Sequence, residues 1–197
     1  MEVDADMPPK AKFTKQQIAN AALQIFRDEG IEKLTSRNLG KKLGSSACPI
    51  FTVFSGMEEV EAAMLESAKA IYKGYVEIGL SQEPPFRGVG EQYIRFAADE
   101  PKLFQLLFMS ETKEALPMDR VLPMLDESYD KILQSIMVSS FVEKEAAEKL
   151  YRHLWVYTHG IACLCATKTC QFSEREIQCM MTEVFQSLLK STGAKHE

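Results

Sequence analysis

Apolar residues recur at intervals of three and four along this chain, and this spacing constrains the fold more than any other feature of the sequence. Ile18, Ala22 and Phe26 set the pattern near the beginning, and no sustained two-residue alternation bounded by turn residues appears. Thr14, with Gln17 three residues later, has the spacing of a helix-capping box. The sequence therefore predicts an all-α protein.

Charge divides the chain into a basic first part and an acidic remainder. Residues 8–56 carry eight Lys and Arg against three Asp and Glu, a balance of +5, in a chain of 197 residues whose net charge is -5. This asymmetry is typical of a basic module on an acidic body, although lysine-bearing helix faces are often only solvated surface. Pro84 and Pro85 interrupt the helical pattern. We therefore expect modules at residues 10–56 and 84–191, with a long helix and linker at 57–83 between them.

The basic module contains three short helical segments in the order of a helix-turn-helix. The second, from Ser36 to Leu43, is followed by Gly44, which can adopt a left-handed turn, and the third runs from Ser46 to Phe54. In this arrangement the third helix enters the major groove of DNA and the second helix braces it. The sequence thus predicts an N-terminal three-helix helix-turn-helix domain whose partner is double-stranded DNA.

This segment resembles the DNA-binding domain of the TetR family of bacterial transcriptional regulators over about residues 14–66. The shared features are AAL-x-x-F-x-x-x-G, LT-x-R-x-L and LG, which begin at Ala21, Leu34 and Leu43. Farther along, Trp155, followed by His159 and Gly160, resembles the Trp-His-Gly signature of one C-terminal domain type in that family. The resemblance implies a C-terminal helical ligand-binding and dimerisation domain, a palindromic operator, a small-molecule inducer and a homodimer.

The third segment departs from the family pattern at positions that contact phosphates. Phe51, Val53 and Met57 stand where family members commonly have a tyrosine, a histidine and a lysine. Because phosphate contacts supply much of the affinity for DNA, we expect other cations, hydroxyls and helix N-terminal amides to make them. Phe51 is expected either to face the DNA or to pack in the small core of the module. The residues expected at the DNA interface are Lys12, Lys15, Thr35, Ser36, Arg37, Lys41, Lys42, Ser46, Ala47, Cys48, Pro49, Phe51 and Thr52.

The second module has the pattern of five further helices, the third of which is expected to run without a break from about Pro117 to Met137. Its methionine and aromatic stripes fit either a plain core or a ligand pocket, and their few polar side chains favour a largely apolar inducer. His159 is expected to be either a satisfied core or interface histidine or a hydrogen-bonding partner of the ligand. The expected ligand-binding residues are Tyr93, Phe96, Phe104, Phe108, Met137, Trp155 and His159.

The resemblance implies that two chains meet through the last two helices, both of which carry apolar faces. The helix around Trp155 is apolar on two sides, which fits a helix placed between a pocket and a partner subunit. The residues expected in the dimer interface are Leu154, Ile161, Ile177, Met181, Val184, Phe185 and Leu188.

Other function classes find little support. His159 and Cys163, four residues apart, leave a metal or thiol sensor as a minor alternative, but Cys163 and Cys165 point about 200° apart on a helix. The sequence has no P-loop, nucleophile elbow or dinucleotide motif, so we expect neither an enzyme nor a cofactor. Five cysteines, an acidic beginning and the lack of a long apolar run favour a cytoplasmic protein without membrane contact.

The sequence as a whole favours a DNA-binding transcriptional regulator, specifically a repressor that a largely apolar molecule releases from its operator. The alternative is a dimeric small-molecule-binding or adaptor protein that has lost DNA binding, because the usual phosphate-contacting residues are missing.

Overall fold

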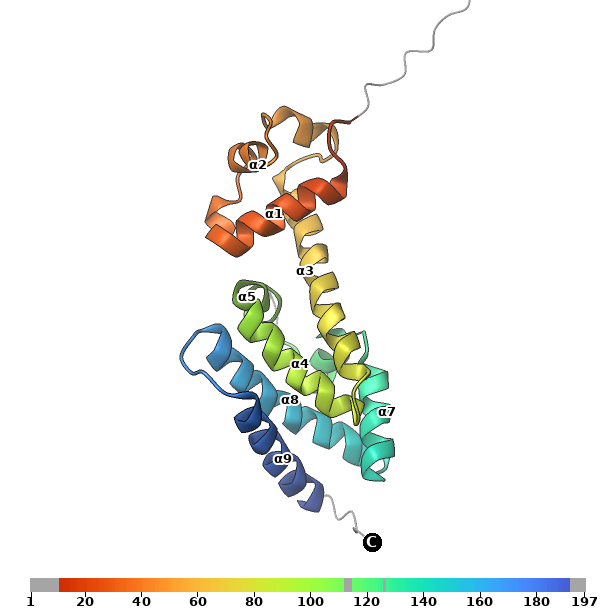
Figure 1. The fold of residues 1–197 in the computed structure, drawn as a ribbon. Helices are drawn as coiled ribbons and strands as arrows, with labels where there is room; N and C mark the ends of the chain where they lie inside the picture. The colour runs from red at the N-terminus through yellow and green to blue at the C-terminus, as the bar shows by residue number, and fades with distance from the viewer. Residues whose placement is uncertain (1–10, 112–114, 126, 192–197) are drawn as a thin grey trace, which may run out of the picture. The chain divides into compact units, whose positions relative to one another are not determined.

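The chain forms two compact helical units. The structure, a computed structural model, describes residues 11–111, 115–125 and 127–191, and all regular secondary structure of these residues is helical (Figure 1). Unit 1 is Met1–Ala70 and unit 2 is Ile71–Glu197. The division falls within helix α3 (Met57–Leu80), inside the segment 57–83 that the sequence predicted as the connection.

Unit 1 contains α1 (Lys15–Glu29), the 3-10 turn η1 (Ile31–Lys33), α2 (Ser36–Lys42), the 3-10 turn η2 (Cys48–Thr52) and the first part of α3. The predicted capping box is present, because the Thr14 hydroxyl accepts from the Gln17 amide at 3.1 Å and the Thr14 amide donates to Gln17 Oε1 at 2.9 Å. Gly44 adopts the predicted left-handed conformation, with φ 65°, in the turn after α2.

A small, filled core holds unit 1 together. Phe26, Leu39, Ile50 and Phe54 are all buried, and the first part of α3 adds further buried apolar side chains to this core. Gly40 on α2 lies so close to the loop beyond it that a Cβ there would meet the backbone carbonyl carbon of Ser46 at 2.8 Å. The turn and α2 are therefore packed backbone against backbone.

The predicted third helix of the helix-turn-helix was wrong in its extent and type. Instead of an α-helix from Ser46 to Phe54, the structure has only η2, a 3-10 turn of five residues. The Thr52 hydroxyl donates to the Pro49 carbonyl at 2.7 Å, where an α-helix would receive a backbone bond, and the Val53 amide donates to the Ile50 carbonyl at 3.1 Å. These local bonds favour a tight turn over an extended helix.

Unit 2 contains the end of α3 and six further helices, which are α4 (Pro85–Asp99), α5 (Pro101–Phe108), α6 (Met118–Leu125), α7 (Tyr129–Ser140), α8 (Lys144–Ala166) and α9 (Glu174–Ser191). The predicted single helix from Pro117 to Met137 was wrong, since it is divided into α6 and α7. Leu122 and Tyr129 are seven residues apart, or about two turns, so the apolar spacing continues across the break and hides it. No helix of the described residues is long and apolar enough to cross a membrane.

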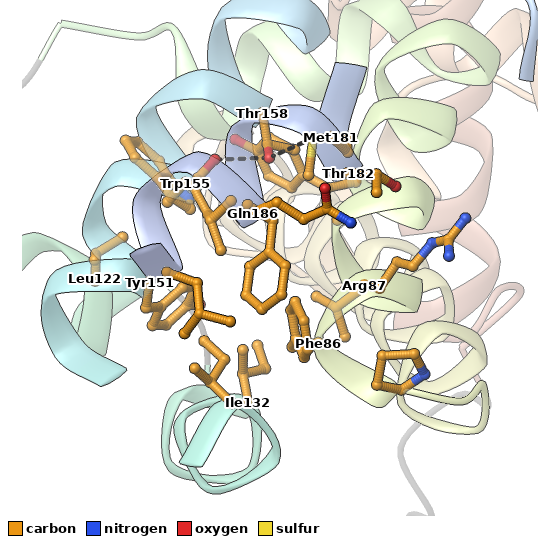
Figure 2. Close-up of a pocket in the computed structure, with 18 of the residues that line it drawn as sticks. Phe86, Arg87, Leu122, Ile132, Tyr151, Trp155, Thr158, Met181, Thr182 and Gln186 are labelled. Atoms are coloured by element: carbon orange, nitrogen blue, oxygen red, sulfur yellow. Dashed lines mark hydrogen bonds between the residues drawn. The ribbon is translucent and has the colours of Figure 1, made fainter. Parts of the chain in front are cut away.

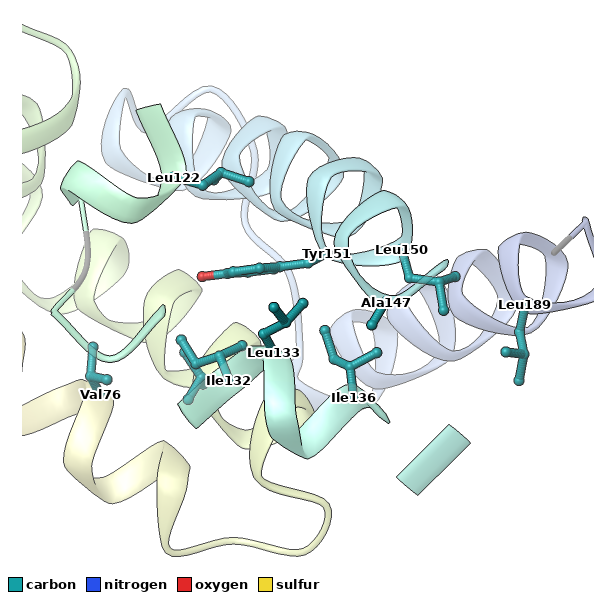
Figure 3. Packing of buried hydrophobic residues seen from close by; sticks show 10 residues of the cluster. Val76, Leu122, Ile132, Leu133, Ile136, Ala147, Leu150, Tyr151 and Leu189 are labelled. Atoms are coloured by element: carbon teal, nitrogen blue, oxygen red, sulfur yellow. The ribbon is translucent and has the colours of Figure 1, made fainter. Parts of the chain in front are cut away.

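Helix α8 is central in unit 2 and packs most extensively on α4, with α7 and α9 also against it. Side chains of α7 and α8, among them Ile132, Leu133 and Leu150, form the largest part of a buried cluster (Figure 3). The end of α3 approaches α4 at backbone distance, because a Cβ on Gly79 would lie 2.6 Å from the Val89 Cα. This contact fixes the beginning of α4, which forms one wall of the site described next.

Candidate ligand cavity and nucleic-acid interface

Unit 2 encloses an apolar cavity of about 530 Å³, within the range of roughly 300–1,000 Å³ that is typical of small-molecule sites. Every helix of unit 2 contributes to its wall, and Figure 2 shows Phe86, Leu122, Ile132 and Tyr151 around it. Aromatic rings make up a large part of the lining, namely Tyr72, Phe86, Tyr93, Phe108, Tyr151, Trp155 and Phe185.

The polar groups deep in this wall already have partners within the protein. The Thr158 hydroxyl donates to the Leu154 carbonyl at 2.7 Å, and the Tyr93 hydroxyl is 2.9 Å from His159 Nδ1. Apart from the aromatic residues, the remaining polar side chains of the lining belong to Arg87, Thr182, Gln186 and Lys190, none of which is buried. An apolar interior with polar groups at its more exposed part suits a molecule with an apolar body.

Three of the seven residues predicted to bind the ligand line this cavity: Tyr93, Phe108 and Trp155. Phe96 and Phe104 are fully buried and pack beside the Tyr93 and Phe108 rings, outside the lining. Met137 packs against the buried cluster of Figure 3. The cavity begins at the first turns of α4, so residues farther along that helix contact α5 instead.

His159 lies behind the cavity wall. Its ring stacks on Trp155, with 4.8 Å between centroids and 8° between planes, while Nδ1 bonds to Tyr93 and Nε2 lies 3.4 Å from Cys163 Sγ. Burial lowers the pKa of His159 and raises the pKa of Cys163. His159 is therefore half-buried with both ring nitrogens engaged within its own chain, and it contacts two residues of the lining, Tyr93 and Trp155.

A metal centre finds no support among the described residues, which contain no group of three or more His, Cys, Asp or Glu side chains suited to hold an ion. The cysteines form no disulfide either, and Cys48, Cys170 and Cys179 are exposed.

Three of the residues predicted for the dimer interface line the cavity: Leu154, Met181 and Phe185. Ile161 is buried within unit 2, and the α9 residues Ile177, Val184 and Leu188 are half-buried. The outer face of α8 carries other residues, with Val156 51% exposed, Leu164 37% exposed and Gly160 between them. The apolar spacing did not distinguish the side of α8 and α9 that faces the cavity from their other sides.

Five of the thirteen residues predicted for DNA binding lie together on one shallow concave surface of unit 1. These are Ser36, Arg37, Lys41, Ser46 and Ala47, which share the surface with Asn38, Gly44 and Ser45. Within it, Arg37 and Lys41 place two cations beside several hydroxyl groups, a combination suited to a phosphate backbone.

Other predicted cations are already engaged. Lys15 forms an ion pair of 2.7 Å with Glu59, and this bond, together with those from Ser55, lowers the pKa of Glu59 to about 2. Lys42 lies 3.6 Å from Asp28, and Lys12 donates to Ser45 Oγ at 3.1 Å.

The remaining predicted DNA-binding residues lie on or beside η2 and at the start of α2. Thr35 caps α2 by accepting from the Asn38 amide. Cys48, Thr52 and Phe51 are exposed, whereas Pro49 is half-buried. Since Phe51 is 45% exposed, it lies outside the small core and is free to face a partner.

Sequence reasoning missed the polar residues of the cavity and the close glycine contacts. Arg87 offered one signal, a single cation among the otherwise apolar positions at the start of α4. Lys190, Gln186 and Thr182 offered none, because polar residues on a terminal helix are usually only solvent-exposed.

Comparisons with known proteins agree with this architecture. Residues 86–190 match the family model described as tetracyclin repressor-like, C-terminal domain. No curated protein is significantly similar in sequence.

Two solved structures resemble the whole chain. One is a TetR-like transcriptional regulator from Rhodococcus sp. RHA1, with 15% identity, a TM-score of 0.58, and coverage of 92% of this chain and 96% of that one. The other is the fatty acid degradation regulator FadR from Bacillus halodurans, with 15% identity, a TM-score of 0.57, and coverage of 98% and 100%. At this identity the likeness concerns the fold. The family match extends over more than half of the chain, which therefore belongs to the tetracyclin repressor-like family and is a TetR-like transcriptional regulator.

Proposed function

We propose that this regulator represses transcription by binding a palindromic operator as a homodimer, and that a largely apolar small molecule in unit 2 releases it. The observation that carries the proposal is the aromatic cavity of about 530 Å³. If stability were the only requirement, side chains would fill this space, because a cavity removes van der Waals contacts.

The concave surface of unit 1 supports the DNA-binding part of the proposal. Arg37 and Lys41 lie on it with the Ser36 and Ser46 hydroxyls, while exposed Phe51 offers an apolar contact that suits a thymine methyl group. Two such surfaces in a symmetric dimer would read two half-sites about one helical turn apart.

The outer face of α8 supports the homodimer, and we assign the seam to Val156, Gly160 and Leu164 in place of Leu154 and Ile161. A Cβ on Gly160 would meet nothing within 4 Å in its own chain, so this glycine leaves room for a close approach by a partner helix. Exposed apolar residues at a spacing of four fit the centre of a helix-pair interface.

Helix α3 supports coupling between the ligand and DNA. Its first part buries Val60 and Met64 in the core of unit 1, and its later part carries Tyr72 in the cavity lining. A ligand that favours one arrangement of Tyr72 therefore acts on a helix that belongs to both units.

The test is salt-dependent binding of the dimer to the DNA upstream of its own gene. We expect Arg37→Ala to weaken binding by about 1–3 kcal/mol without unfolding, whereas the control Arg95→Ala, on α4, should bind as the wild type does. Ligands that change the fluorescence of Trp155, the only tryptophan, should also release the DNA. Unchanged operator affinity in Arg37→Ala would contradict the assigned interface.

The dimer seam has its own test. Val156→Glu places a charge on the proposed interface and should yield monomers in analytical ultracentrifugation, because an unpaired buried charge opposes association. Gln134→Glu, at an exposed position of α7, is the matched control and should leave the dimer intact.

The alternative, a dimeric small-molecule-binding or adaptor protein without DNA binding, is favoured by the short η2 turn and by the ion pair of Lys15 with Glu59. The same experiment separates the two functions. A dimer that binds ligands but retains no salt-dependent affinity for any upstream fragment would establish the alternative.

A further inference from the structure

We propose that the molecule held in unit 2 is an amphipathic organic anion, with its apolar body in the cavity and a carboxylate beside Arg87 and Lys190. This inference rests on the proposed ligand-binding function and refines it, since the sequence alone favoured an uncharged, largely apolar compound for want of a partner for charge.

The charges of the lining provide the first reason. Among the described residues that line the cavity, Arg87 and Lys190 are cationic and none is Asp or Glu. A low-dielectric wall with charge of one sign favours a ligand of the opposite sign at that place. A cationic ligand would meet repulsion there, and a neutral one would gain at most a hydrogen bond without the charge attraction.

The position of these cations provides the second reason. Arg87 lies on α4 and keeps 41% of its side chain exposed, while Lys190 is an exposed residue near the end of α9. A carboxylate beside them would remain partly hydrated, which avoids the large penalty of burying an ion. The apolar part of the same molecule would fill the space bounded by rings such as Tyr151 and Phe185.

The geometry of Arg87 provides the third reason. Its Nε donates to Glu91 Oε1 at 3.0 Å, and this i, i+4 ion pair holds the side chain in one direction. The bond uses one of the five N–H donors of a guanidinium, so donors remain for a bidentate carboxylate. Glu91 itself is not part of the lining, so its carboxylate does not face the ligand.

Two neutral donors lie on the same side of the cavity. Figure 2 shows the Gln186 amide and the Thr182 hydroxyl toward the Arg87 side of the lining, away from Leu122 and Ile132. Both residues belong to α9, as does Lys190. The polar groups of Arg87, Thr182 and Gln186, from α4 and α9, thus lie toward one side of the cavity, which is the arrangement that an amphipathic molecule requires.

The experiment uses the full-length protein and three probes of equal chain length, namely dodecanoate, dodecanol and dodecylammonium, with Trp155 fluorescence as the readout. The two ions are used below their critical micelle concentrations and dodecanol below its solubility limit. We expect dodecanoate to bind at least tenfold more tightly than dodecanol, and dodecylammonium to bind most weakly. In Arg87→Gln, which leaves Lys190 in place, the affinity for dodecanoate should fall toward that of dodecanol, and the affinity for dodecanol should change much less. Arg95→Gln, on the same helix but outside this lining, is the control.

The possible outcomes are distinct. Equal affinities for dodecanoate and dodecanol in the wild type, or tighter binding of the ammonium, overturn the anion while leaving the apolar cavity and the proposed function in place. If none of the three probes binds, the ligand-binding part of the proposed function fails and this inference fails with it. Should Arg87→Gln lose its cooperative thermal transition, Lys190→Gln replaces it, because this exposed side chain can be changed without disturbing the α4 ion pair.

Discussion

Unit 1 and unit 2 use apolar side chains in opposite ways. In unit 1, Phe26, Leu39, Ile50 and Phe54 fill a small core. Unit 2 buries more apolar side chains and still keeps a cavity of about 530 Å³ among them. The difference shows that a binding site in a helical domain depends on what keeps the space open as much as on what lines it.

Rings held at angles to one another supply that support in unit 2. Tyr72 and Phe108 meet at 75° with centroids 4.9 Å apart, and Tyr93 and Phe108 meet at 62° with centroids 5.1 Å apart. Edge-to-face contacts of this kind resist collapse, because a ring that turned into the cavity would lose its aromatic partners. Unit 1 lacks such a framework among its described residues, and its side chains meet directly.

The largest expected effect tests this contrast with a matched pair of leucines. Leu39→Ala, in the filled core, should lower the free energy of unfolding of unit 1 by about 2–5 kcal/mol. Leu154→Ala should destabilise unit 2 by less, because Leu154 already borders empty space and has fewer contacts to lose. Peptide-resolved hydrogen exchange measures both units separately. Equal losses in the two variants would indicate that the cavity is filled in solution.

An effect of intermediate size concerns the pH dependence of the stability of unit 2, and it would sharpen the contrast with unit 1. Burial lowers the pKa of His159 below its ordinary value of 6.5, so the unfolded chain takes up the proton first as the pH falls. The contribution of His159 to the free energy of unfolding is therefore fully present above about pH 6.5. It declines below that pH with a slope of at most about 1.4 kcal/mol per pH unit.

Thermal melts of unit 2 between pH 8 and pH 5 measure this effect. His159→Gln should reduce the decline relative to the wild type, whereas His153→Gln, at an exposed position of the same helix, should not. A decline that is identical in the wild type and both variants would exclude His159 as its source.

The smallest expected effect lies on the surface of unit 1. Lys15→Gln should change operator affinity by less than about 0.5 kcal/mol, because Glu59 already neutralises this lysine. Lys41→Gln should reduce the slope of log affinity against log salt by about one. Fluorescence anisotropy with labelled operator DNA at several salt concentrations measures both. A larger loss for Lys15→Gln than for Lys41→Gln would mean that the Glu59 pair opens on DNA.

Local features of unit 1 could be predicted from the sequence because their causes are local. Thr14 and Gln17 cap α1 across three residues, and Gly44 permits one turn. The same kind of reasoning missed η2, where the bond from the Thr52 hydroxyl to the Pro49 carbonyl outweighs the apolar spacing. The all-α fold and the family could be predicted for the same reason, since periodicity and short motifs carry them.

The cavity could be predicted only in part, because it depends on which side of each helix meets which neighbour. Leu154 and Phe185 have the spacing of an interface residue and line the cavity instead. Phe96 and Phe108 are both phenylalanines on the apolar side of a helix, yet only Phe108 lines the cavity. Periodicity assigns a residue to an apolar side of its helix and does not tell a partner subunit from an empty space.

The backbone contact between Gly79 and Val89 gives α3 the properties of a lever. Since no side chain separates the two helices there, the last turn of α3 cannot rotate without carrying the first turns of α4 with it. Helix α3 has 24 residues, which corresponds to a length of about 36 Å. A rotation of about 5° at the glycine end would therefore displace the opposite end by about 3 Å, a distance comparable to that of a hydrogen bond. Because of the close approach at Gly79, a change at the first turns of α4 also changes the direction of the last turn of α3.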